Sequence, residues 1–88
     1  SAQTIIELSG DEVINLLKKS TSYNTNPDHF TIGKVVTTTF AQTSATIYKV
    51  ESHRFLLVTR RSFTDYIWMW IQQASQEYGL KILPPQKR

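Results

Sequence analysis

Few side chains in this sequence could perform acid–base chemistry or bind a metal. The two histidines, His29 and His53, lie close in sequence to the carboxylates of Asp28 and Glu51. A histidine beside a carboxylate can act as a general base, or the pair can bind a divalent metal. However, neither spacing matches a two-histidine metal motif, and both histidines fall in expected loops or turns. We therefore predict no catalytic residue, no metal site, no cofactor and no enzymatic activity.

A second possible chemistry comes from basic residues that alternate with aromatic residues along the expected strands. Lysine and arginine hold phosphates while aromatic rings stack on bases, so this mixture is typical of sheets that bind RNA or single-stranded DNA. Against it, a net charge of +3 offers few phosphate contacts, and basic residues at strand ends also prevent edge pairing. Nucleic-acid binding is an alternative hypothesis here, and its contacts would be Lys34, Tyr48, Lys49, Arg54, Arg60 and Arg61.

The elements that must position these residues follow from the periodicity of apolar side chains and from turn residues. β-branched runs predict strands, and apolar residues at helical spacing predict helices. Ser9 and Glu12 have capping-box spacing before the first helix, and Ser62 precedes the second, which Gly79 would end. The predicted order is a strand over 4–8, a helix over 10–19, a loop over 20–28, strands over 30–40, 45–50 and 54–59, a helix over 62–79 and a possible short strand over 80–83.

This order predicts a small α+β domain in which a three-stranded antiparallel meander is extended by possible N- and C-terminal strands. We expect both helices on one face of the sheet, in the order β-α-β-β-β-α with a possible last strand. Residues 1–88 would form one domain, with an ordered core over about 4–83 and a basic tail over 84–88 that packs on nothing. The expected core residues are Val13, Leu16, Leu17, Val36, Leu56, Val58, Ile67, Trp70 and Ala74.

The second predicted helix is apolar on more than one side. Beyond its core stripe it carries Tyr66, Trp68, Met69 and Ile71, which one stripe of about 100° cannot hold. The strand over 54–59 is also apolar on both faces, and placing Leu56 and Val58 in the core would leave Phe55 and Leu57 exposed. Either another part of the chain covers these side chains, or they bind a partner. The second reading predicts a protein interface made of Tyr66, Trp68, Met69 and Phe55.

The central order of helix, three strands and helix resembles that of double-stranded RNA-binding domains and of mRNA-cleaving toxins of the HicA type. The first helix of those toxins reads much like residues 11–19 here. The second helix begins with an aromatic and acidic segment where the RNA-binding domains have lysines, and Ser52-His53 falls in a turn where the toxins place a strand. No site residue is carried over from either family.

Composition limits the remaining alternatives. With 40% hydrophobic and 19% charged residues the chain should fold, and its apolar runs are far too short to cross a bilayer. The absence of cysteine is compatible with a reducing compartment, so we expect a cytoplasmic protein. Because burying surplus aromatic side chains yields more free energy than a few phosphate contacts, the favoured hypothesis is a small non-catalytic regulatory module. It would bind a protein partner or self-assemble, most simply as a homodimer.

Overall fold

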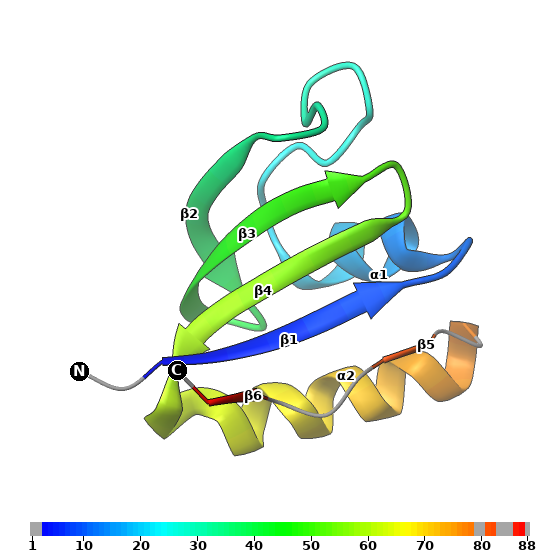
Figure 1. The fold of residues 1–88 in the computed structure, drawn as a ribbon. Helices are drawn as coiled ribbons and strands as arrows, with labels where there is room; N and C mark the ends of the chain where they lie inside the picture. The colour runs from blue at the N-terminus through cyan, green and yellow to red at the C-terminus, as the bar shows by residue number, and fades with distance from the viewer. Residues whose placement is uncertain (1–2, 79–80, 83–85, 88) are drawn as a thin grey trace.

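In the computed structural model, which describes residues 3–78, 81–82 and 86–87, both helices cover one face of an antiparallel sheet (Figure 1). The predicted α+β class is confirmed, as is the order of strands and helices. Among the described residues no helix has the length and apolar character needed to span a membrane. The elements are β1 (Gln3–Ser9), α1 (Val13–Ser20), β2 (Val35–Phe40), β3 (Thr43–Glu51), β4 (Arg54–Arg60), the 3-10 turn η1 (Arg61–Phe63), α2 (Thr64–Tyr78), β5 (Lys81–Ile82) and β6 (Gln86–Lys87).

The sheet has the strand order β2-β3-β4-β1-β5, and β6 also pairs with β1. The meander β2-β3-β4 is local in sequence, whereas β1 joins β4 across a long separation in the register Ile5↔Val58. The basic tail was predicted to pack on nothing, and this is wrong for its described part. Residues 86–87 pair with Thr4 and Ile5, because β1 would otherwise expose its unpaired backbone groups.

The turn between β2 and β3 consists of Ala41 and Gln42, which have φ values of 51° and 70°. Positive φ at both central residues is typical of the tight hairpin turn whose twist matches that of the flanking strands. It makes Phe40 and Thr43 direct partners, so β3 begins two residues before the start at residue 45 that the sequence predicted.

Two element boundaries differ from the sequence-based prediction because glycines redirect the chain. Gly10 has φ 129° after β1, so α1 begins only at Val13, and Ser9 pairs within the sheet and does not cap the helix. Gly33 has φ 90° and donates its N–H to the carbonyl of Lys49, which delays the start of β2 to residue 35. The predicted strand over 30–40 is therefore five residues too long, and among the described strands β3 is the longest.

The core lies between the helices and one face of the sheet. On β4 this face carries Phe55 and Leu57, both fully buried, whereas Leu56 and Val58 lie half-buried on the opposite face. The sequence-based assignment of these four residues is therefore reversed. A period of two separates the faces of a strand, but it does not say which face the helices cover. The buried hydrophobic residues are Ile6, Leu8, Val13, Leu16, Leu17, Phe30, Phe40, Ala41, Ala45, Ile47, Phe55, Leu57, Ile67, Ile71 and Ala74.

Trp70 was predicted to be a core residue, and it lies half-buried at the edge of the core between the two helices. Its indole N–H donates to the hydroxyl of Ser20 at 2.8 Å, and that hydroxyl donates to the carbonyl of Leu16 at 2.7 Å. The pair of bonds fixes α2 against the last turn of α1, because a tryptophan N–H in this position needs an acceptor.

Candidate interaction surfaces

Neither histidine belongs to a metal-binding cluster of described side chains. His29 stacks at a tilt on Tyr23, with ring centroids 5.2 Å apart, and His53 lies in the turn after β3 beside Ser52. Both imidazoles are exposed. Across the part of the chain that the structure describes, no group of three histidine or acidic side chains could hold a metal ion.

The basic residues proposed to contact nucleic acid are spread over different faces of the molecule. Lys49 points into the core face of the sheet, is 3% exposed, and donates from Nζ to the carbonyl of Phe30 at 2.8 Å. Lys34 is exposed, but its ammonium donates to the carbonyl of His29 and lies 5.8 Å from the Tyr23 ring. Because Lys49 is enclosed, the residues do not form a continuous basic platform.

Of the other members of that set, Arg54 lies on the face of the sheet opposite Lys49 and is bound to acidic neighbours. Its guanidinium contacts both carboxylate oxygens of Glu7 at 3.1 Å and the carboxylate of Glu51 at 3.4 Å. The hydrogen bonds to Glu7 are the main cause that raises the pKa of Arg54 above its usual value. This arginine therefore serves a cross-strand ion pair, while Arg60 and Arg61 are exposed where β4 ends.

The face of the sheet that the helices leave uncovered carries five neighbouring apolar side chains. We call this the open sheet face. Its five members are Ile5, Val35, Tyr48, Leu56 and Val58. They are adjacent because the register pairs Val35 with Tyr48, Tyr48 with Leu56, and Ile5 with Val58. Val35 is 57% exposed and Tyr48 37% exposed, while the other three are half-buried. The side chains on a solvent-facing side of an antiparallel sheet are usually polar. An apolar band across four strands on that side therefore indicates a binding surface.

The interface predicted from the second helix is only partly assembled. Tyr66 and Met69 are 47% and 59% exposed and lie three residues apart on the outer side of α2. Trp68 is half-buried against the core, and Phe55 is fully buried inside it. The expectation that Phe55 is exposed is therefore wrong, because this residue belongs to the helix-covered face of β4.

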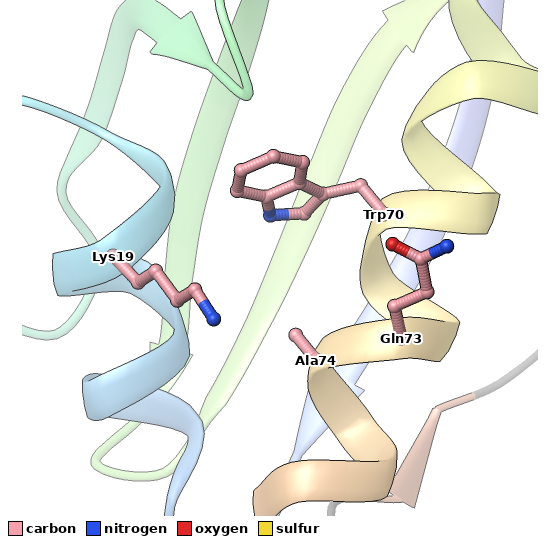
Figure 2. A pocket seen from close by; sticks show the side chains of 4 residues that line it. All are labelled: Lys19, Trp70, Gln73 and Ala74. Atoms are coloured by element: carbon pink, nitrogen blue, oxygen red, sulfur yellow. The ribbon is translucent and has the colours of Figure 1, made fainter.

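A shallow groove of about 240 Å³ lies between α1 and α2 (Figure 2). The described residues that line it are Lys19 from α1 and Trp70, Gln73 and Ala74 from α2. The indole N–H of Trp70 is already bonded to Ser20, so it cannot serve a ligand in the groove. The few polar groups here do not converge as they do in specific small-molecule sites.

Sequence reasoning missed Ile5 and Val35 as surface candidates, and it placed Leu56 and Val58 in the core. The available signal was the strand over 54–59, whose two faces are both apolar. That pattern indicated a surplus of apolar surface, but only the position of the helices shows which face of the strand remains open.

Comparisons with known proteins give a consistent result. The model of the sarcosine oxidase gamma subunit family matches residues 1–77. The sarcosine oxidase gamma subunits of Corynebacterium sp. strains P-1 and U-96 are 26% and 22% identical over 77 residues, which is 88% of this chain. The chain spans only 38% of the length of these curated relatives.

The fold matches a solved structure equally well. A chain of the heterotetrameric sarcosine oxidase from Corynebacterium sp. U-96, solved in complex with pyrrole 2-carboxylate, superposes with a TM-score of 0.84 at 22% identity. The match covers 86% of this chain and 39% of that chain. These likenesses contradict the hypothesis of a non-catalytic regulatory, self-assembling module and its nucleic-acid-binding alternative. Neither a homodimer nor a nucleic-acid partner finds support in them.

Proposed function

Since this chain belongs to the sarcosine oxidase gamma subunit family, we propose that it acts as a subunit, or as part of a subunit, of a multi-subunit sarcosine oxidase. The observation that carries the proposal is the family match over residues 1–77, which takes in both helices and the four main strands almost entirely. The sequence predicted a chain with no enzymatic activity. In this proposal the chain is part of an enzyme complex, and its own role is in the assembly of that complex.

The partners in this proposal are the other subunits of the oxidase. The solved relative comes from a heterotetramer, an assembly in which unlike chains contact one another. A protein partner was predicted from the sequence, and we propose that this partner is another subunit of the enzyme.

The open sheet face is the surface that we propose for this contact. Burying a half-exposed leucine, valine or tyrosine is worth on the order of 1 kcal/mol, so five such side chains contribute several kcal/mol before the costs of association. Arg54 and Glu7 lie at one end of the apolar band, where a polar rim would surround it. We propose Tyr66 and Met69 on α2, with Trp68 beside them, as a second and smaller contact.

The test is co-expression of the tagged chain with the other oxidase subunits of its own host, followed by purification and an assay with sarcosine. Leu56→Asp places a charge in the centre of the open sheet face and should reduce recovery of the complex at least about tenfold, while the free chain stays folded. Met69→Asp tests α2 in the same way and should have the smaller effect.

Asn24→Asp is the matched control, because it adds the same charge in an exposed loop and keeps the oxygen that accepts from the N–H of Asn26. It should leave assembly unchanged. If wild-type chain and oxidase subunits never co-purify, or if Leu56→Asp assembles like the wild type, the proposed role of the open sheet face is refuted.

A further inference from the structure

The strand β2 lies at the end of the sheet and pairs with β3 on one side only. The tight turn makes Phe40 and Thr43 a hydrogen-bonded pair, and in antiparallel strands such pairs alternate with non-bonded ones. The pairs Thr38–Ala45 and Val36–Ile47 are then bonded within the sheet. The N–H and C=O groups of the intervening residues on β2, at positions 35, 37 and 39, must point away from β3.

No other described part of the chain takes up these outward groups. The nearest backbone bonds beyond the ladder lie at its two ends, where Ala41 donates to the carbonyl of Ser20 and Gly33 donates to that of Lys49. The contrast with β1 is informative, because its outer edge is occupied by β5 and β6 of the same chain.

The residues of β2 do not protect this edge from pairing. Its sequence, Val-Val-Thr-Thr-Thr-Phe, has no charge, no proline and no bulge, and every residue is β-branched or aromatic. Natural edge strands usually carry at least one such device, since an unprotected edge recruits other strands. Uncharged, β-branched segments of this kind are well suited to accept an added strand.

Burial points to the same conclusion on the core side of the strand. Val36 and Thr38 face the helices but are only half-buried, whereas Ala45 and Ile47, their partners on β3, are buried. One further strand outside β2 would cover them. On the other side Val35, Thr37 and Thr39 belong to the same face as Tyr48, so an added strand would extend the open sheet face without a break.

We propose that an extended segment of another oxidase subunit completes the sheet by adding antiparallel to β2. It bonds to the backbone of Val35, Thr37 and Thr39 and carries uncharged side chains, apolar on the side that covers Val36 and Thr38. This inference rests on the proposed function, since the strand comes from a subunit of the same enzyme.

Site-resolved amide hydrogen exchange tests it on the free chain and on the complex co-purified with the other subunits. The amides of Val35, Thr37 and Thr39 should exchange rapidly in the free chain and at least about 100-fold more slowly in the complex. The amides of Val36 and Thr38 serve as internal controls, because the pairing with β3 protects them in both states.

The outcomes separate this inference from the proposed function. A complex in which the three amides are unchanged overturns the added strand and leaves subunit membership standing. Failure to form any complex refutes the proposed function itself. Protection that develops in the free chain as its concentration rises, with a doubled mass by light scattering, means that a second copy fills the edge, and it overturns the inference as stated.

A proline variant supplies an independent measurement of affinity. Thr39→Pro removes an outward N–H and no bond to β3, so the free chain should keep its melting temperature within a few degrees. Its affinity for the other subunits should fall about tenfold, as expected for loss of one backbone bond. Thr39→Val keeps the N–H and should bind like the wild type. Wild-type affinity in the folded proline variant would contradict the inference.

Discussion

The two faces of β4 are almost equally apolar, yet they have different roles. Phe55 and Leu57 are fully buried beneath the helices, while Leu56 and Val58 lie half-buried on the open sheet face. Side chains of one chemical type thus stabilise the fold on one face and are available to a partner on the other. The comparison teaches that hydrophobicity in a strand measures the total surface to be covered, and that the covering elements determine what each half does.

The largest expected effect comes from comparing the two adjacent leucines of β4. Leu57→Ala opens a cavity in the core and should lower the free energy of unfolding by about 2–5 kcal/mol. Leu56→Ala removes the same atoms from a half-buried site and should cost the free chain about 1 kcal/mol or less.

Chemical denaturation of both variants checks this difference. Equal losses of stability at the two positions would mean that the open sheet face is covered within the free chain, which would break the comparison.

The next effect concerns Lys49, which is the only charged residue buried on the core face among the residues that the structure describes. Lys49→Met removes the bond from its ammonium to the carbonyl of Phe30 and should destabilise the chain by about 1–3 kcal/mol. Amide exchange in the loop before β2 should accelerate as well, because this bond holds the loop on the sheet. Lys34→Met, at an exposed site, is the control and should change stability little. A gain in stability in Lys49→Met would show that the cost of burying the ammonium exceeds the value of its contacts.

The smallest effect compares two threonines on opposite faces. The hydroxyl of Thr59 is buried on the core face and bonds to none of the described residues, so Thr59→Val should stabilise the chain by about 1 kcal/mol. On the open sheet face the hydroxyl of Thr46 lies 3.2 Å from that of Thr37. Thr46→Val loses this bond and should be neutral or slightly destabilising. Thermal melts check this comparison, and Thr59→Val should have the higher melting temperature of the two variants. A lower melting temperature for Thr59→Val would mean that the Thr59 hydroxyl has a hydrogen-bond partner on the core face.

The order of elements could be predicted from sequence because it depends on local patterns. The β-branched runs and the helical spacing around Ile67 and Ala74 specify strands and a helix without reference to distant residues. The starts of α1 at Val13 and of β2 at Val35 were harder to predict from the sequence. They depend on the positive φ of Gly10 and Gly33, and in the second case on a bond to the distant Lys49.

The candidate surfaces were harder to predict, because exposure is a property of the packed chain. Tyr66 and Met69 are exposed on α2, and their role in an interface stays a prediction, whereas Ile71 is fully buried and Phe55 was assigned to the wrong face of its strand. The prediction that the basic residues share one face was wrong for a related reason. Lys49 and Arg54 are close in sequence, but the alternation of strands and the irregular register between Lys49 and Glu51 place them on opposite faces.

By itself, the sequence determined that this chain forms a small α+β domain with more apolar surface than one core can bury. Those properties follow from local periodicity and from composition, which every segment carries with it. The tertiary structure decided which apolar face became the core, which face stayed open, and that β2 was left as an unpaired edge. These outcomes depend on where two helices and a distant first strand settle, because burial results from contacts between segments far apart in the chain.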